Sequence, residues 1–332
     1  MTERLLDVRN LSIEIQTRNG PATVVDNIDI HVDKGETIGI VGESGCGKSL
    51  TMLSLLKLLP NKIRVSSGTA NFENRDLLTL SKSELRHVRG GQIGFVFQDP
   101  MTSLNPVMKI GAQLAEPLIH HKHMSKEAAR KRAGELLRLV GIPGAEQRLD
   151  AYPHELSGGM RQRVMIAIGL ACDPELLIAD EPTTALDVTI QAQIVDLVKD
   201  LRKKLGMSVV WITHDLALVA GLADRILVLY AGTVVEDAPV DDLFASPSHP
   251  YTRGLLASIP KIGAPDAERL SSIGGTPPEP GRRPQGCPFE PRCALAQPVC
   301  RQVVPKLEAL RGEATTHRVA CHVANRVLEA AL

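Results

Sequence analysis

A glycine-rich stretch ending in lysine and serine follows the apolar run Thr37–Val41, and it fits the phosphate-binding pattern G-x-x-x-x-G-K-[ST]. Glycines let consecutive backbone N–H groups turn toward phosphates, and the start of the next helix adds partial positive charge. We expect Lys48 to reach the β- and γ-phosphates of a nucleotide and the Ser49 hydroxyl to ligate Mg²⁺. The predicted nucleotide-binding residues are Gly42, Glu43, Ser44, Gly45, Cys46, Gly47, Lys48, Ser49 and Leu50.

A second candidate site lies where the apolar run Leu176–Asp180 ends in a carboxylate that is followed by Glu181. Ligands of open α/β folds bind at the carboxyl ends of strands, so we expect Asp180 to hold the Mg²⁺ shell there. Two adjacent carboxylates suit a division of labour in which one stabilises the metal and the other, Glu181, polarises an attacking water.

A second glycine turn, LSGGM at 156–160, opens the sequence RQRVMIAIGL, which we expect to be helical. Taken alone, Ser157-Gly158-Gly159 is typical of an ordinary helix N-cap, although a helix start also attracts anions. Its position 23 residues before Asp180 makes it a candidate for a second phosphate contact.

The bulk composition restricts the class of protein. The 332 residues carry 38 basic and 38 acidic side chains and only 3% aromatics, which argues against a nucleic-acid partner. We find no run of 18 apolar residues and no signal-peptide pattern at the N-terminus. We therefore expect a cytoplasmic chain that reaches a membrane only through a partner.

The elements that must position these residues follow from periodicity. Short apolar runs with a turn at Asn19-Gly20 predict an antiparallel β layer over residues 1–40. Helices are expected at 49–59, 188–205 and 216–223, and a helical insertion at about 100–156. LLIAD, SVVWIT and RILVLY alternate with helices and predict a parallel sheet. Beyond Val240 the sequence is loop-rich, since 13 of the 22 prolines lie between Pro239 and Pro305.

Together these motifs make residues 5–240 resemble an ABC transporter nucleotide-binding domain. The resemblance implies the α/β fold of P-loop NTPases, a RecA-like core with an antiparallel β-subdomain and an α-helical subdomain, followed here by a Cys-rich C-terminal extension. It divides the chain into a core (1–98 and 157–240), a helical subdomain (99–156) and the extension (241–332).

The resemblance also assigns roles. It implies that two such domains dimerise head to tail and bind ATP between the P-loop of one and the signature Ser157, Gly158 and Gly159 of the other. Glu181 would be the catalytic base, His214 the γ-phosphate contact and Gln98 a further catalytic residue. Ser49, Gln98 and Asp180 would ligate Mg²⁺, and Asp187 would belong to the D-loop ALD at 185–187.

The sequence departs from this family near residue 15, where an aromatic side chain usually stacks on adenine. This chain has Ile15 there, and its first aromatic residue is Phe72. Aliphatic packing by Ile15 or Val25 is the alternative, and we expect weak selectivity for the nucleotide base.

Three further stretches resemble the ATPase subunits of oligopeptide/dipeptide importers: FQDPMTSLNP at 97–106, ADEPTTALDVTIQAQI at 179–194 and SHPYTRGLLASIP at 248–260. The implied partners are a second, non-identical ATPase subunit, two transmembrane permease subunits and an extracytoplasmic binding protein. The implied location is the cytoplasmic face of a bacterial membrane. Uptake of nickel, haem, glutathione or sugars, a soluble ABC ATPase outside transport, and a redox-sensing regulator remain alternatives.

Four cysteines gather in the C-terminal extension with the spacing C-x5-C-x6-C-x20-C: Cys287, Cys293, Cys300 and Cys321. Four thiolates can hold a metal, but structural zinc favours C-x2–4-C pairs, which are missing among these four. A [4Fe–4S] cluster also takes four cysteines, and the resemblance favours it. Zinc and unliganded thiols stay open.

Overall fold

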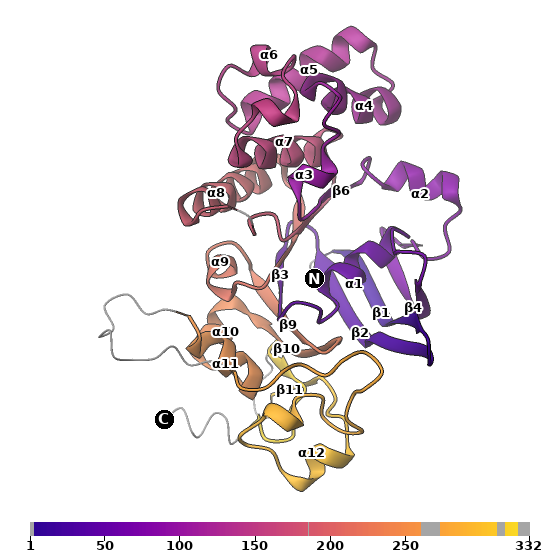
Figure 1. Ribbon diagram of the computed structural model, residues 1–332, viewed down its shortest axis with the longest axis vertical. Coiled ribbons are helices and arrows are strands. Elements are labelled where there is room, and N and C mark those ends of the chain that lie inside the picture. Colours follow the sequence, from indigo (N-terminus) through magenta and orange to yellow (C-terminus); the bar gives the residue numbers. More distant parts are fainter. Residues whose placement is uncertain (1–2, 185, 260–272, 311–315, 325–332) are drawn as a thin grey trace. The chain divides into compact units, whose positions relative to one another are not determined.

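The structure is a computed structural model that describes residues 3–184, 186–259, 273–310 and 316–324. The chain forms two compact units (Figure 1). The first contains residues 32–37 and the described part of 79–213. The second contains residues 4–31 and 38–78 and the described residues from His214 onward.

Three parallel strands form the sheet of the first unit, with β7 between β6 and β8. Val96 lies opposite Ala179, and Asp180 lies opposite Ile212. Almost every residue of these strands is buried, as expected when helices cover both faces of a parallel sheet. The strands are β6 (Ile93–Val96), β7 (Leu176–Asp180) and β8 (Ser208–Thr213).

Helices α4, α5 and α7 of the first unit pack on one another (Figure 1). The helical structure predicted at about 100–156 is confirmed. One apolar face of α5 is buried at Ala133, Leu136 and Leu137, and Val140 and Gly141 follow, with Gly141 at φ 73°. The helices of this unit are α2 (Lys82–Val88), α3 (Pro100–Ser103), α4 (Ile110–Lys122), α5 (Lys126–Leu139), α6 (Ala145–Arg148), the 3-10 turn η1 (Pro153–Glu155), α7 (Gly158–Leu170) and α8 (Val188–Leu205).

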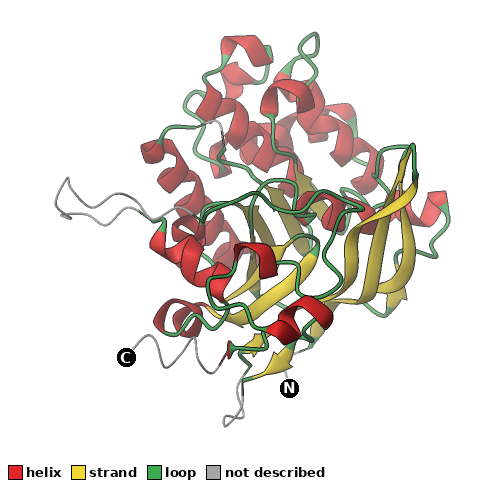
Figure 2. Cartoon of the chain, turned by 60° about the horizontal axis from the view of Figure 1, so that its bottom comes forward, coloured by secondary structure: helices red, strands yellow, loops and turns green. Residues whose placement is uncertain are grey.

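An antiparallel sheet of order β2-β1-β4-β5 begins the second unit (Figure 2). The hairpin predicted at Asn19-Gly20 is confirmed, since the turn joins β1 to β2 and Gly20 has φ 105°. Strand β4 was not predicted from the sequence. The strands are β1 (Arg4–Thr17), β2 (Gly20–Asp33), β4 (Ile63–Phe72) and β5 (Arg75–Asp76).

The second unit also holds β3, which pairs in parallel with β9, and β9 pairs antiparallel with β10. Helix α1 was predicted to run to Leu59 but ends at Leu55. There the Leu58 N–H donates to Leu53 O and Lys57 takes φ 50°, a left-handed helix end. Helix α9 likewise ends before the predicted Ala223. The elements are β3 (Thr37–Val41), α1 (Lys48–Leu55), α9 (Leu216–Ala220), β9 (Arg225–Tyr230) and β10 (Thr233–Pro239).

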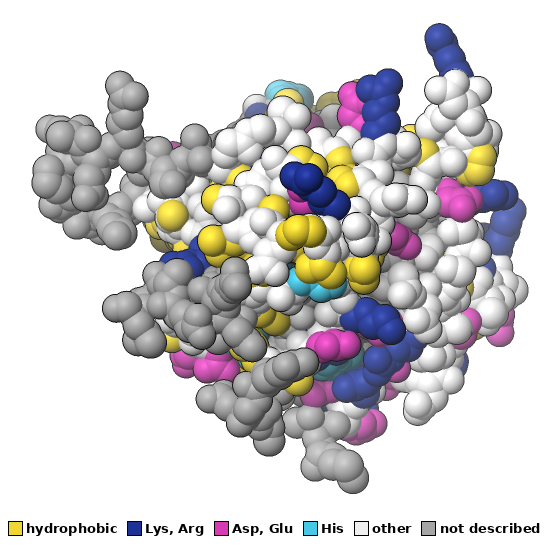
Figure 3. Space-filling model, turned by 90° about the horizontal axis from the view of Figure 1, so that it is seen from below, with side chains coloured by type: hydrophobic (Ala, Val, Ile, Leu, Met, Phe, Trp, Pro, Cys, Tyr) yellow, Lys and Arg dark blue, Asp and Glu magenta, His cyan; other side chains and the backbone are white. Residues whose placement is uncertain are grey.

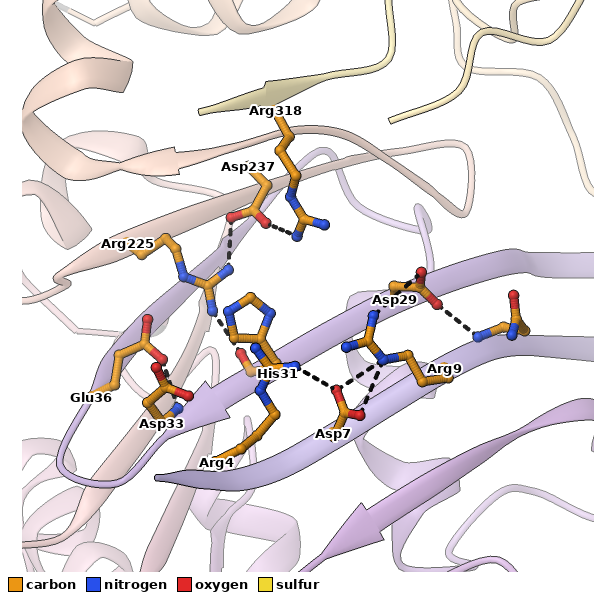
Figure 4. Close-up of polar contacts among 11 residues, drawn as sticks. Arg4, Asp7, Arg9, Asp29, His31, Asp33, Glu36, Arg225, Asp237 and Arg318 are labelled. Carbon is orange, nitrogen blue, oxygen red and sulfur yellow. Dashed lines mark hydrogen bonds and ion pairs between the residues drawn. The ribbon is translucent and has the colours of Figure 1, made fainter. Parts of the chain in front are cut away.

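The C-terminal region, residues 240–324, returns to the same sheet through β12, which pairs with β10. Buried Asp237 of β10 lies between Arg225 and Arg318 (Figure 4), with 2.7 Å between Arg225 Nη1 and Asp237 Oδ1. The elements are α10 (Val240–Ala245), α11 (Pro250–Ala257), the 3-10 turn η2 (Glu290–Arg292), α12 (Pro298–Gln302), β11 (Glu308–Ala309) and β12 (Arg318–Val319).

Apolar side chains gather on the face of the molecule seen from the α12 side (Figure 3). In the C-terminal region Leu295, Val299, Val303 and Val304 are each at least 38% exposed. Across the described ranges, no helix is both long enough and apolar enough to cross a membrane.

Candidate functional site

The predicted phosphate-binding loop lies in the second unit, between the end of β3 and the start of α1. Gly45 and Gly47 have φ 78° and 101°, which L side chains rarely adopt. A Cβ added at Gly42 would lie 2.2 Å from Leu229 O, and one at Gly47 would lie 2.8 Å from Val25 Cγ2. The loop therefore requires glycine at these positions, and the predicted strand–loop–helix context is confirmed.

Lys48 is only 4% exposed, and its ammonium lies inside the loop. Its Nζ donates to Gly42 O at 2.7 Å and to Glu43 O at 3.1 Å. The neighbouring Cys46 thiol is buried, and burial raises its pKa although the Lys48 charge opposes the shift. Cys46 is thus poorly suited to act as a nucleophile.

Glu43 connects this loop to the C-terminal region, a connection that was not predicted from the sequence. Its backbone N–H donates to the Tyr251 hydroxyl at 2.9 Å. Its carboxylate accepts two hydrogen bonds from the Arg292 guanidinium, at 2.7 and 3.0 Å. Tyr251 lies 208 positions from Glu43 in the sequence, and Arg292 lies 249 positions from it. Neither periodicity nor a local motif can predict contacts over such separations.

The carboxylate site lies in the first unit, at the carboxyl end of β7. Asp180 is 5% exposed and Glu181 is 9% exposed. Gln98, which follows β6, donates from Nε2 to Glu181 Oε2 at 3.1 Å, and Thr184 Oγ1 donates to the same oxygen at 2.9 Å. The parallel pairing of β6 with β7 brings Gln98 and Glu181 together, as parallel strands end at one edge.

The backbone at Glu181 helps to orient its carboxylate. Glu181 takes φ 43°, a region that non-glycine residues enter rarely, and its N–H donates to Ile212 O of β8 at 2.9 Å. Thr184 was not among the predicted site residues, and its place in ADEPTTALD, three residues after Glu181, was the only signal for it.

The predicted signature turn forms the start of α7. Ser157 is the N-cap, and its hydroxyl accepts a hydrogen bond from Met160 N at 3.3 Å. Ser157 and Gly158 are exposed, and a Cβ added at Gly159 would lie 3.0 Å from Ile190 Cγ2 of α8. The turn is therefore packed against the start of α8 while its outer edge stays open.

The D-loop aspartate caps α8, where Asp187 Oδ1 accepts from Ile190 N at 3.0 Å. Asp187 is exposed, and the next residue, Val188, is 81% exposed. Ala185, the first residue predicted for the D-loop, lies outside the described residues. His214 follows β8 directly and is exposed.

These residues thus fall into two groups, one in each unit. Lys48, Ser49 and the glycines of the loop belong to the second unit, as does His214. Gln98, Asp180, Glu181, the signature and Asp187 belong to the first. Within the first unit Gln98 contacts Glu181, and within the second Lys48 contacts the backbone of the loop.

The side chains named for adenine are both in the second unit. Val25 has no exposed surface and packs on Gly47 of the loop, while Ile15 lies on β1 opposite Ile63 and is partly exposed. The role of aliphatic packing in holding adenine stays a prediction.

The four C-terminal cysteines are free thiols. Burial raises the pKa of Cys287 to about 11 and that of Cys321 to about 12, and the neighbouring thiols add to both shifts. Cys287 N donates to Cys300 O at 2.8 Å. However, within the described part of the chain no three His, Cys, Asp or Glu residues are arranged to hold a metal ion. The donor chemistry fits a metal group and the geometry does not.

Comparisons with known proteins agree with the fold and with the positions of the loop and the carboxylate site. Residues 25–184 match the ABC transporter family, and residues 235–300 match the oligopeptide/dipeptide transporter C-terminal region. Pro260, which ends the SHPYTRGLLASIP stretch, lies in that second match but outside the described residues.

Two relatives from Bacillus subtilis show how much of the chain is shared. The oligopeptide transport ATP-binding protein OppD is 54% identical over 297 residues, covering 89% of this chain and 83% of the relative. The dipeptide transport ATP-binding protein DppD is 49% identical over 331 residues, covering 99% and 98%.

Two solved structures share the fold. The dimeric post-hydrolysis structure of the ATP-binding cassette MJ0796, bound to ADP and phosphate, has a TM-score of 0.64 and 31% identity, and the match covers 71% of this chain and 98% of that one. CbiO1 from Clostridium perfringens has a TM-score of 0.63 and 29% identity, with coverage of 73% and 91%. The loop, the carboxylate site and these similarities together place the chain in the ABC transporter family, among the ATP-binding subunits with an oligopeptide/dipeptide transporter C-terminal region.

Proposed function

We propose that the chain is the ATP-hydrolysing subunit of an importer that carries oligopeptides or dipeptides across the cytoplasmic membrane. The observation that carries the proposal is the presence, in one chain, of a glycine-requiring phosphate loop and a carboxylate, Glu181, held by Gln98 and Thr184. The names of the relatives at about 50% identity supply the peptide substrate.

The ATP assignment is supported by Gly42 and Gly47, which have no room for a side chain, and a glycine loop lets backbone N–H groups face phosphate oxygens. We assign residues 42–50 to ATP binding, with Lys48 as the phosphate contact. Ser49, Gln98 and Asp180 have the oxygen ligands that Mg²⁺ prefers. When bound, Mg²⁺ neutralises charge on the phosphate oxygens.

Glu181 is the proposed general base. Its carboxylate accepts hydrogen bonds from Gln98 and Thr184 and is therefore fixed in position. A fixed carboxylate can take a proton from water, as general-base catalysis requires. We assign to His214 the role of contacting the γ-phosphate of ATP.

The signature and D-loop support an assembly of two ATPase subunits. Ser157, Gly158 and Asp187 are exposed, and so is the apolar side chain of Val188. A helix start with free N–H groups can bind the phosphates of ATP held by another subunit. We propose that this second subunit is a non-identical homologue, that two permease subunits and a binding protein complete the importer, and that the chain works at the cytoplasmic face of the membrane.

The loop assignment is tested by Lys48→Ala, with calorimetric titration of ATP into the purified full chain. We expect nucleotide binding to be lost, because the variant removes the ammonium inside the loop. Lys57→Ala is the matched control, since Lys57 lies just beyond the end of α1, the helix that begins at Lys48, and is exposed. Unchanged ATP affinity of Lys48→Ala would contradict the assignment.

The substrate is tested in the reconstituted importer. We expect its ATPase rate to rise with a peptide-loaded binding protein and to stay basal when nickel, haem or glutathione is supplied instead. Stimulation by one of these and not by peptides would replace the proposed cargo while leaving the motor intact.

A [4Fe–4S] cluster on Cys287, Cys293, Cys300 and Cys321, or zinc in its place, stays a prediction. Its support is that neighbouring thiols help to raise the pKa values of Cys287 and Cys321, which places these side chains near the other cysteines. Anaerobic purification followed by iron, sulfide and zinc analysis decides the question. Absence of all three from a chain never exposed to air would reject the prediction.

The division into a core (1–98 and 157–240), a helical subdomain (99–156) and an extension (241–332) is likewise proposed. Helices α4, α5 and α6 all lie between residues 99 and 156, which supports the boundaries of the helical part. Limited proteolysis should release fragments cut near these boundaries; cuts confined to the middle of α4 or α5 would argue against them.

A further inference from the structure

We propose that Arg292 of the C-terminal region is a positioning residue of the nucleotide site, which holds and neutralises the Glu43 carboxylate so that the loop can accept phosphates. The inference rests on the proposed role of the loop and extends it to a residue far away in the sequence. All the residues that carry it belong to the second unit.

The Arg292 guanidinium is fixed on every side. Nη1 and Nη2 bind the two oxygens of Glu43 at 2.7 and 3.0 Å, a bidentate geometry that is among the strongest of charged hydrogen bonds. Nε donates to Gly274 O at 2.8 Å, and the guanidinium carbon lies 5.6 Å from the centre of the Tyr230 ring and 5.9 Å from that of Phe289. The side chain is 4% exposed, so this contact is not a transient surface ion pair.

The pairing places opposite charges against each other. Arginine stays protonated in proteins, and its two hydrogen bonds hold the guanidinium against the Glu43 carboxylate. The guanidinium is therefore a permanent cation, and the carboxylate beside it is compensated in the folded chain.

The backbone of Glu43 is held as firmly as its side chain. Its N–H donates to the Tyr251 hydroxyl, and its carbonyl accepts from Lys48 Nζ. Tyr251 has no exposed surface, and its own N–H donates to His249 Nδ1 at 3.0 Å. The residue that orients Lys48 is thus tied at both its N–H and its carboxylate to the C-terminal region.

A second arginine of the C-terminal region binds the segment beside the loop. Arg283 Nη1 lies 3.1 Å from Asp26 Oδ2, and Nη2 donates to Val24 O at 3.3 Å. Between these two residues lies Val25, which packs on Gly47. Two separate contacts therefore join the C-terminal region to the surroundings of the loop.

The physical reason for compensation is electrostatic. A free carboxylate in an anion-binding loop repels a nucleotide, and the repulsion grows with the number of phosphate charges. Removing Arg292 should therefore weaken ATP binding more than ADP binding. A purely structural ion pair would lower stability without distinguishing the two nucleotides.

The test is Arg292→Gln in the full chain, with dissociation constants for ATP and ADP from calorimetry. We expect the dissociation constant for ATP to rise roughly tenfold and that for ADP by about threefold. Both increases should be smaller at high salt, which screens the charge. Adding Glu43→Gln removes the uncompensated charge and should restore ATP affinity to within about twofold of the parent. Arg292→Lys keeps the positive charge but loses the bidentate geometry, so its ATP affinity should lie between those of the parent and Arg292→Gln.

Arg301→Gln is the matched control, because Arg301 pairs with Glu290 at 2.9 Å in the same region but is 77% exposed. We expect it to leave both constants unchanged. If Arg292→Gln does not fold, the double variant and Arg292→Lys carry the test.

Parental ATP affinity in Arg292→Gln, or equal losses for ATP and ADP that Glu43→Gln does not rescue, would overturn the proposal. Failure of the loop assignment is distinguished by Lys48→Ala. If that variant loses ATP binding while Arg292→Gln keeps it, only the role of Arg292 fails.

Discussion

His249 should make the stability of the chain depend on pH. It is the N-cap of α11 and is 1% exposed. Its ring Nδ1 accepts from Tyr251 N, and its backbone N–H donates to Glu236 Oε2 at 3.0 Å. Burial lowers the pKa of His249 from 6.5 to about 4, although the Glu236 charge opposes the shift. The folded chain thus holds this imidazole neutral at a pH where the unfolded chain protonates it.

The sign and size follow from proton linkage. Between pH 6.5 and 4 the unfolded state binds the extra proton, so stability is full above pH 6.5 and is lost as the pH falls. A shift of about 2.5 pKa units corresponds to about 3.4 kcal/mol once the pH is below both values. At pH 5 the loss is about 2 kcal/mol by the same relation.

The perturbation is His249→Asn, because an asparagine oxygen can cap the helix but cannot titrate in this range. Urea unfolding followed by circular dichroism at pH 7.5 and 5.0 gives the free energy of unfolding of parent and variant. The parent should lose about 2 kcal/mol more than the variant between the two pH values, since other groups cancel in the difference.

His154→Asn is the control, since His154 is exposed and should leave the pH dependence as in the parent. If His249→Asn and the parent lose the same free energy between pH 7.5 and 5.0, the reasoning from burial is wrong.

Three further substitutions test other parts of the structure. Glu181→Gln should bind ATP but hydrolyse it at least about 100-fold more slowly, measured by phosphate release, because it loses the base; full turnover would exclude Glu181 from that role. Gly94→Ala should cost about 2–3 kcal/mol in urea unfolding, since the new Cβ would lie 2.1 Å from Gly169 O; an unchanged midpoint would refute the close packing of α7 on β6. Asp237→Ala should cost about 3 kcal/mol in the same assay, because it leaves Arg225, 9% exposed, without its buried partner; a loss below about 1 kcal/mol would contradict this.

Local motifs made the loop and the carboxylate site predictable. The glycines of residues 42–47 form the turn between β3 and α1. Because this turn is local, its sequence pattern alone identifies it, without information on tertiary contacts. Asp180 and Glu181 follow a run of buried apolar residues, and β7 ends there as expected. Strand order then brings Gln98 to Glu181.

Contacts over long sequence separations could not be predicted. Arg292 has no periodicity or motif linking it to Glu43, and β4 was missed because Ser66, Ser67 and Gly68 interrupt its alternation. Prolines between 239 and 305 correctly indicated many loops, but nothing in the composition indicated that Arg318 would return to pair with Asp237. Such pairings depend on tertiary structure rather than on local propensity.

The return of β12 to β10 has a consequence for the order in which the protein can mature during synthesis. Glu236, fully buried, accepts hydrogen bonds from Ser248 N and His249 N, and the ring of His317 lies 2.7 Å from it. A nascent chain that has emerged only as far as α11 leaves one side of β10 without its partner strand, and an open edge invites pairing with other chains. The nucleotide-binding part should therefore depend on chaperone protection until the ribosome has released residues near 318, and premature termination in this region should yield an aggregating product rather than a shortened enzyme.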